Sequence, residues 1–259
     1  MKKKLEVKEL NIEHLAAVMT LQDKIIAHLH PDEKHFILKR SAADFIKALD
    51  SEDTHMLGVF DGDKLIAQSM FDFPKDGNGR DYQEFADDVP NSNLVIYKAT
   101  LVDVDYRGQG LMQELLSYRE AKAKAAGKTT AVSQIAADNP ASWINALRNG
   151  MSIRKVDNDP EDHAEVLYMR KDFNKPQVSA AVGETFVMYI GQNIHKEIPA
   201  LFNKMRYLTA KGYQGVAIER QNNSIVWAKP ALRTEAALEQ SVVSQPFYLL
   251  NVRGKTIRN

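Results

Sequence analysis

The sequence predicts an α/β fold, because strand-like and helical patterns alternate along most of its 259 residues. Three observations support this prediction. A strand-like run over residues 93–104 leads through a glycine loop into a strongly helical stretch over residues 111–126. A further helix is expected where Asn139 can act as an N-cap and Pro140 takes the first helical position. The pair Asp61-Gly62 lies between two apolar runs, which is typical of a β-hairpin.

The elements before the glycine loop follow in order. A short strand is expected over residues 5–10, and Asn11 can cap a helix. Apolar residues then recur at helical spacing, at Ile12, Leu15, Met19, Ile26 and Leu29. A short helix over residues 42–49 precedes the hairpin, whose strands are expected over residues 55–60 and 64–73. The stretch 74–93 holds Gly, Asp, Asn and Pro with little apolar pattern, so we expect a long loop.

The elements after the glycine loop alternate regularly. Gly127 is expected to end the helix, a strand follows over residues 129–135, and the Asn139-led helix stops near Gly150. A strand over residues 164–170 completes the order β-α-α-β-β-loop-β-α-β-α-β.

Composition is typical of a soluble, cytoplasmic protein. The 34 basic and 34 acidic residues cancel, which argues against a nucleic-acid partner bound by a broad basic surface. The absence of cysteine excludes disulfides, thiol catalysis and cysteine-ligated metals. No apolar run is long enough to span a membrane, and the residues after the first lysines are too charged for a signal peptide.

The glycine loop has the properties of an anion site. Gly108 and Gly110 let the backbone approach a ligand with no Cβ in the way. The helix that begins at Leu111 points free N–H groups and its positive dipole end at the loop, and Arg107 adds a fixed charge. A pyrophosphate is the natural ligand of such a loop.

This order of elements, together with the loop, the Asn139-led helix and its stop at Gly150-Met151, resembles the GNAT superfamily of acyl-CoA N-acyltransferases. The resemblance covers residues 5 to about 172 and implies a mixed, partly splayed sheet flanked by helices. The family's loop signature, Q/R-x-x-G-x-G/A, is matched by Arg107 and Gly110, and Met112 departs from it. A large side chain at that position is tolerable if it points into the core.

A second family signature, N-x-x-[AS]-x-x-L-Y-x-x-x-G-[FY], is matched in part. Asn139, Ser142 and Gly150 fit, whereas Asn145, Ala146 and Met151 stand where Leu, Tyr and an aromatic residue usually fall. The family often uses the tyrosine to protonate the departing CoA thiolate, so Ala146 leaves that role without its usual residue.

The resemblance implies acetyl-CoA as co-substrate and direct transfer of the acetyl group to a primary amine. The residues expected to hold the pyrophosphate are Arg107, Gly108, Gln109, Gly110, Leu111 and Met112. The pantetheine arm is expected to pair with Leu101, Val102 and Asp103 as an added strand, with Asn139 and Ser142 on its other side. The partner would be an amine-bearing small molecule or peptide.

The amine must lose a proton before it attacks, because with a pKa of about 10.4 only roughly one lysine-like amine in two thousand is free at neutral pH. Candidate catalytic residues are Tyr97 and Asp103 on the central strand, and Tyr97 could also replace the missing acid. The acceptor-pocket segment adds His28, His30 and His35.

No metal site is expected. The three histidines do not share a helical face, since Pro31 breaks the helix after the second. The stretch 76–81 begins like a calcium loop, but Arg80 and Asp81 replace an oxygen ligand and the required glycine. The same loop carries Glu84, Asp87 and Asp88, which either attract a cationic amine or are simply solvated.

The chain divides into a catalytic domain over residues 1–172, a linker over 173–183 and a small α+β domain over 184–259. In the last part strands are expected at 184–190, 216–219, 225–228 and 247–252, with helices from near Pro199 to Gly212 and over residues 234–240. This β-α-β-β-α-β order is ferredoxin-like. The domain could bind a ligand, form a homodimer surface, cover the acceptor site or pack without activity. The alternative function for the whole chain is a catalytically weak CoA-binding sensor, suggested by Ala146.

Overall fold

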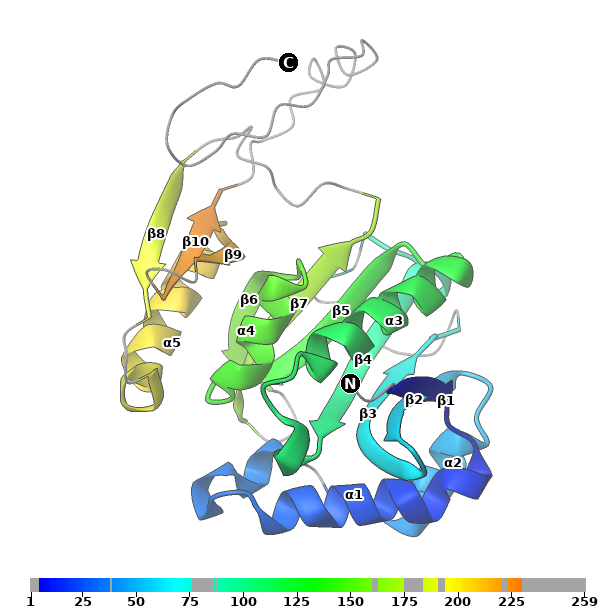
Figure 1. The fold of residues 1–259 in the computed structure, drawn as a ribbon. Helices are drawn as coiled ribbons and strands as arrows, with labels where there is room; N and C mark the ends of the chain where they lie inside the picture. Colours follow the sequence, from blue (N-terminus) through cyan, green and yellow to red (C-terminus); the bar gives the residue numbers. More distant parts are fainter. Residues whose placement is uncertain are drawn as a thin grey trace, which may run out of the picture.

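The computed structural model describes residues 5–37, 39–75, 86, 88–159, 163–174, 184–190, 194–219 and 223–229. The strands in this part of the chain are β1 (Glu6–Glu9), β2 (Thr54–Asp61), β3 (Lys64–Asp72), β4 (Leu94–Val102), β5 (Thr130–Ala136), β6 (Ser152–Asn158), β7 (Glu165–Asp172), β8 (Thr185–Tyr189), β9 (Gln214–Glu219) and β10 (Ser224–Ala228). They form one ten-stranded sheet in the order β1-β2-β3-β4-β5-β7-β6-β9-β10-β8 (Figure 1). Neighbouring strands are antiparallel except β4 and β5, which are parallel.

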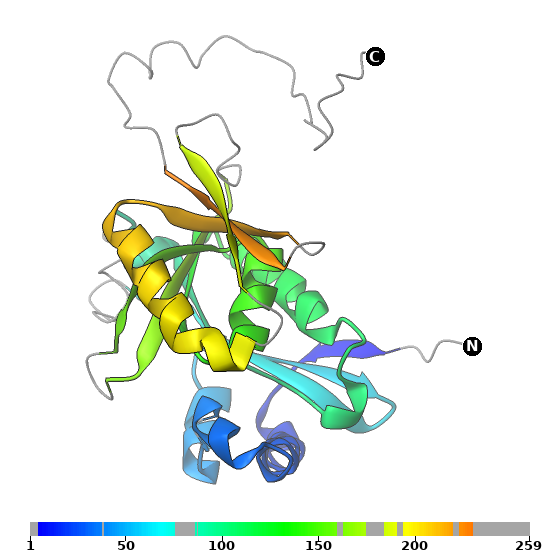
Figure 2. The ribbon, with the colours of Figure 1, turned by 90° about the vertical axis from the view of Figure 1, so that its left-hand side faces the viewer.

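The helices are α1 (Leu15–Ala27), α2 (Ala42–Leu49), α3 (Leu111–Ala125), α4 (Pro140–Arg148) and α5 (Ile194–Ala210), with short 3₁₀ turns at η1 (Ile12–His14), η2 (Pro31–Phe36), η4 (Asn91–Asn93) and η5 (Val104–Tyr106). Helices α3 and α4 lie on one side of the sheet, and α1 and α2 lie below it in Figures 1 and 2. The mixed α/β fold and helix-flanked sheet expected from the sequence are therefore confirmed.

Two buried clusters hold these layers together. On one side Leu115 and Leu116 of α3 and Trp143 of α4 pack against the sheet. On the other side Val18 and Ile25 of α1 pack with side chains of α2, β2 and β3. The buried positions of α1 are Val18, Leu21, Gln22 and Ile25, so its core face is shifted from the spacing expected from Ile12, which is 50% exposed.

Capping residues explain why several helices begin where the sequence predicts. Ser41 and Asp44 form a reciprocal capping box at α2, in which each side chain accepts a hydrogen bond from the other's backbone N–H. The Asn139 side chain accepts from the Ser142 N–H, 3.2 Å away, and Pro140 takes the first position of α4. The first residues of α2 and α4 are therefore determined by local sequence.

Strand β6 is an element that the sequence pattern did not reveal. It pairs with β7 along most of its length, with Val156 opposite Leu167. Its sequence, Ser-Ile-Arg-Lys-Val-Asp-Asn, is short and polar and does not alternate cleanly between apolar and polar residues. Tertiary pairing, rather than intrinsic pattern, therefore makes this segment a strand.

The described part of the C-terminal region is a β-α-β-β unit. Strand β10 lies between β8 and β9, and β9 continues the main sheet by pairing with β6. The predicted start of α5 near Pro199 is wrong, because the helix begins at Ile194 and includes that proline. Pro199 lies inside this helix, where it has no N–H to donate to the carbonyl four residues earlier. The helix and strand expected at 234–240 and 247–252 lie outside the described residues.

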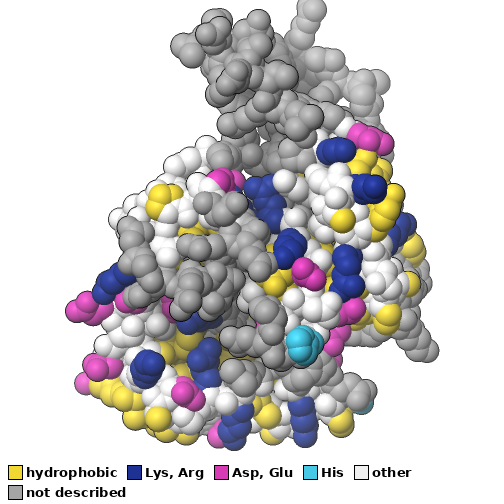
Figure 3. Space-filling model, turned by 180° about the vertical axis from the view of Figure 1, so that it is seen from behind, with side chains coloured by type: hydrophobic (Ala, Val, Ile, Leu, Met, Phe, Trp, Pro, Cys, Tyr) yellow, Lys and Arg dark blue, Asp and Glu magenta, His cyan; other side chains and the backbone are white. Residues whose placement is uncertain are grey.

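Charged side chains of both signs are interspersed over the face seen in Figure 3. No helix among the described residues has both the length and the apolar character to cross a membrane. Three or more His, Asp or Glu side chains arranged to hold a metal ion do not occur in the described ranges.

Candidate active site

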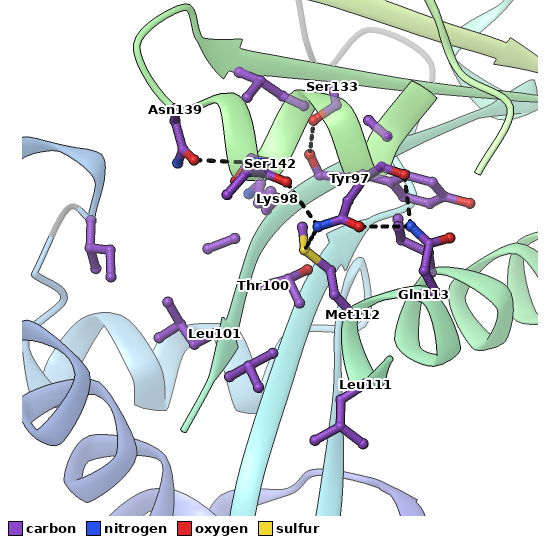
Figure 4. Close-up of a pocket in the computed structure, with 18 of the residues that line it drawn as sticks. Tyr97, Lys98, Thr100, Leu101, Leu111, Met112, Gln113, Ser133, Asn139 and Ser142 are labelled. Carbon is purple, nitrogen blue, oxygen red and sulfur yellow. Dashed lines mark hydrogen bonds between the residues drawn. The ribbon is translucent and has the colours of Figure 1, made fainter. Parts of the chain in front are cut away.

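A cavity of about 890 Å³ opens where β4 and β5 separate (Figure 4). The two strands pair only between residues 94–96 and 130–132. Beyond this point β4 remains paired with β3, and β5 with β7, so the facing edges of β4 and β5 no longer bond to each other. The Ser133 hydroxyl donates to the Tyr97 carbonyl, 3.0 Å away, at the point of separation. An elongated ligand with amide groups can pair with strand edges of this kind.

The glycine loop forms one end of the cavity. Gly108 and Gly110 have φ angles of 75° and 84°, which a side chain would strain, and a Cβ at either position would point into open space. Gly110 is the N-cap of α3 and supplies no side chain to satisfy the first N–H groups of the helix. Arg107, Leu111 and Met112 also line the cavity. The loop therefore leaves helix N-terminal N–H groups without a side-chain cap, an arrangement that favours an anion.

Strand β4 contains a bulge in the middle of the cavity wall. Ser69 pairs with Thr100 and Phe71 with Tyr97, so that Lys98 and Ala99 together face Met70. A bulge leaves backbone groups out of the ladder and turns them toward neighbouring space. Residues 97–102 all line the cavity, including the expected binding residues Leu101 and Val102.

Helix α4 forms the opposite wall through Asn139, Ser142 and Asn145. Asn145 also joins α4 to α3, because its side chain accepts from Gln113 Nε2 at 3.1 Å and donates to Met112 Sδ at 3.3 Å. This role for Asn145, which stands where the family usually has leucine, was not apparent from the sequence. Ala146 is buried and lines the cavity, so the volume of a tyrosine is left open there.

Tyr97 lines the deep end of the cavity. Its side chain is 3% exposed, and its hydroxyl has no hydrogen-bond partner in the described part of the chain. Burial raises the pKa of this phenol, so it holds its proton firmly at neutral pH. In Figure 4 Tyr97 and Ser133 lie at one end, and Leu101 and Leu111 at the other.

Asp103 does not line the cavity. Its buried carboxylate pairs with Lys24 at 2.5 Å and Lys64 at 2.8 Å, and it accepts from the Asp105 N–H. Burial alone would raise the pKa of Asp103, but the hydrogen bonds from the two lysines outweigh it and lower the pKa to about 2. A carboxylate so firmly ionised and paired is a poor proton acceptor, so Asp103 is not suited to act as the general base. Gln109 is also exposed outside the cavity wall.

Another wall of the cavity is built by α1 and the segment that follows it, which the family resemblance implies would shape an acceptor pocket. Ile25, Leu29 and Ile37 supply apolar surface, and Glu33 and Arg40 supply charge. Among the described residues that line the cavity, Glu33 is the one carboxylate, against five Arg and Lys residues. The sequence pattern predicts that Glu33 belongs to a solvated helix end. No pattern in the sequence singled it out, because its position depends on how α1 crosses the sheet.

The histidines of the same segment are placed differently. His28 Nδ1 lies 2.7 Å from the Lys24 carbonyl, and neither His28 nor His30 is among the cavity-lining residues. The side chain of His35 lies outside the described atoms. The acidic loop at 76–87 also falls largely outside the described residues, while Asp88 forms an ion pair with Arg170. Asp88 therefore stabilises the fold through an ion pair with Arg170.

Comparison with known proteins agrees with this geometry. The model of the acetyltransferase (GNAT) family matches residues 18–151, more than half of the chain, and the chain belongs to this family. A comparison with curated proteins gives no match.

The chain is also similar in structure to several solved GNAT proteins. One is yncA from Salmonella typhimurium, solved with its cofactor acetyl-CoA, at 14% identity over 69% of this chain and 99% of that one, with a TM-score of 0.52. Another is an N-acetyltransferase from Staphylococcus aureus Mu50, at 11% identity over 66% and 99%, with a TM-score of 0.52. The GNAT domain of S. lividans PAT is 16% identical over 65% and 90%, with a TM-score of 0.50. At these identities the likeness concerns the fold.

Proposed function

We propose that this protein is an N-acyltransferase that moves an acetyl group from acetyl-CoA to a primary amine by direct attack on the thioester. The observation that carries the proposal is the single cavity that runs from the glycine loop along the separated edge of β4 to the bulge at Lys98 and Ala99. An anion site, a free strand edge and a break in the ladder are what a pyrophosphate, an amide-bearing arm and a thioester carbonyl require.

We propose that different residues bind different parts of acetyl-CoA. The loop from Arg107 to Met112 binds the pyrophosphate through backbone N–H groups, although Gln109 contributes no side chain to the cavity. Leu101 and Val102 offer their backbone to the arm, and Asn139 and Ser142 lie across from them. When bound, the thioester supplies an activated acyl carbon. The excess of cationic residues along the wall suits a donor that carries several phosphates.

Glu33 is our proposed proton acceptor. It is the carboxylate that the described cavity wall presents on the acceptor side, where an incoming ammonium must lose a proton. Apolar neighbours such as Ile25, Leu29 and Ile37 favour an acceptor with an apolar body next to its amine. An amine-bearing small molecule or peptide terminus in the cytoplasm fits this description.

Two measurements test the proposal. Calorimetry should detect binding of acetyl-CoA, and thiol release should be observed with acetyl-CoA and a panel that includes polyamines, amino acids, peptide termini and lysine. Loss of acetyl-CoA binding in Gly110→Trp is expected if the loop holds the pyrophosphate. Failure of the unmodified protein to bind acetyl-CoA would remove the proposal.

For the C-terminal region we propose a separate module over residues 184–259, joined by residues 173–183 to the catalytic domain of residues 1–172. The described unit β8-α5-β9-β10 is contiguous in sequence and continues the sheet through the pairing of β9 with β6, while Phe202 and Met205 of α5 share a buried cluster with Trp143 of α4. Exposed Val187 and Tyr189 on β8 are available for a homodimer contact or a ligand.

A further inference from the structure

Arg119 of α3 is a buried cation without a carboxylate partner. It is 2% exposed, and its Nη1 donates to the carbonyl oxygens of Lys98 at 3.3 Å and Met70 at 3.4 Å. No carboxylate in the described part of the chain forms an ion pair with it, and its Nε has no partner there. Burial lowers the pKa of Arg119 to about 10, so the side chain is still charged at neutral pH.

Among the described residues, the other buried arginine provides a direct comparison. Arg170 is 5% exposed, and its guanidinium is paired with both Asp88 and Asp172. Removing a cation from water without an opposite charge is costly, which is why buried arginines are normally paired. Arg119 therefore lacks the counter-ion that Arg170 has, and Arg119 differs from Arg170 in lining the cavity.

A second unpartnered donor lies beside Arg119. The guanidinium carbon of Arg119 is 4.3 Å from the centre of the Tyr97 ring, and the Tyr97 hydroxyl also lacks a partner in the described residues. Both residues line the same cavity. A guanidinium and a phenol that keeps its proton form a pair of donors suited to a carboxylate.

The position of this pair along the cavity matches the acyl end of the donor. From Gly110 to Arg119 the helix rises about 13 Å, and β4 covers about the same length from Val102 back to Lys98. An arm that starts at the loop and follows β4 therefore brings its thioester to Lys98 and Ala99. Arg119 is hydrogen-bonded to that same bulge.

Resting on the proposed function, we infer that the preferred acyl group carries a carboxylate of its own, as in the mono-thioester of a short dicarboxylic acid, and that Arg119 and Tyr97 bind this carboxylate. In the reaction the amine nitrogen forms a bond to the thioester carbon and the carbon–sulfur bond breaks. The proton lost by the amine passes to Glu33, and the thiolate takes a proton from solvent to leave as the thiol. The distal carboxylate is unchanged and serves only in recognition.

The inference is tested by binding, independently of turnover. Calorimetry with the full chain should give an affinity for succinyl-CoA about ten- to a hundredfold higher than for acetyl-CoA, the gain expected of a charge-assisted hydrogen bond. Arg119→Met should abolish this preference, and Arg119→Lys should keep part of it. Tyr97→Phe, which removes one hydroxyl, should reduce the preference less than Arg119→Met.

The possible results distinguish failure of this inference from failure of the proposed function. Equal affinity for the two donors, or an Arg119→Met variant that keeps the preference, would overturn the inference and leave N-acyl transfer standing. If Arg119→Met does not fold, as judged by circular dichroism, the unmodified protein and Tyr97→Phe still decide the result. Binding of neither donor would remove the proposed function and the inference together.

Discussion

The ammonium of Lys24 lies 2.5 Å from the carboxylate of Asp103, which ties α1 to the end of β4 directly before the glycine loop. Lys64, next to the β2–β3 turn, approaches the other oxygen of the same carboxylate at 2.8 Å. Asp103 thus joins α1, the β2–β3 hairpin and the start of the glycine loop at one buried point.

This arrangement predicts a loss of stability in acid. Because the folded-state pKa of Asp103 is about 2, below the ordinary value near 3.9, its contribution is complete above about pH 4 and is lost as the pH falls through 2. Asp103→Asn should lower the free energy of unfolding by roughly 1–3 kcal/mol at pH 6, and the difference should shrink toward pH 2. Urea unfolding at several pH values measures this. Exposed Asp63→Asn is the control, and a difference independent of pH would contradict the prediction.

Gly110 and Gly127 lie at the two ends of α3 with similar φ angles of 84° and 73°, and both have open space at the Cβ position. Tryptophan at either site should therefore cost a similar amount of stability, about 1–2 kcal/mol from the left-handed backbone. Only Gly110→Trp should abolish CoA binding, because only that side chain would enter the anion site. Calorimetry with CoA and thermal unfolding of both variants check this, and equal losses of CoA affinity would be inconsistent with the loop assignment.

Glu33→Gln should lower the maximal rate of acetyl transfer by about 10²–10³-fold, a range within that typical of a lost general base. The Michaelis constant for acetyl-CoA should change little, since Glu33 belongs to the segment that we propose holds the acceptor. Glu13→Gln, an exposed substitution on η1, is the matched control. A maximal rate unchanged by Glu33→Gln would mean that water or another group accepts the proton of the amine.

Gly215 marks the junction of β9 with β6. A Cβ there would lie 2.9 Å from Ile153 Cδ1 and 3.3 Å from Ile153 Cβ, so Gly215→Val should destabilise the junction by about 1–3 kcal/mol through overpacking. Ile153→Ala should relieve part of that cost in the double variant, although it is itself destabilising. Thermal unfolding of the unmodified protein, the two single variants and the double variant gives the coupling free energy between the two sites. Strictly additive effects on stability would mean that the two residues are not in contact.

The sequence was most informative where local chemistry decides structure. The start of α2 at Ala42 follows from the Ser41 and Asp44 capping box, and the loop geometry at Gly108 and Gly110 follows from their freedom at positive φ. The GNAT family was evident from these local signals and their order, and the family model confirms it.

Features that depend on long-range packing were not predictable in this way. The polar strand β6 forms because β7 and β9 pair with it, not because its residues alternate. The bulge at Lys98 is a matter of register with β3, and the burial of Arg119 depends on where α3 crosses that bulge. The position of Glu33 likewise depends on the path of α1 across the sheet. Nothing in the local spacing of these residues marks them as cavity residues.

The pairing of β9 with β6 has a consequence for the solubility of the catalytic domain on its own. In a chain ending at Asp172, β6 would be an exposed edge strand whose unpaired backbone N–H and C=O groups could pair with a strand of another molecule. Such a truncated protein should therefore aggregate or form dimers through this edge strand, and sedimentation would detect this. The C-terminal unit thus also protects the sheet against unwanted self-association.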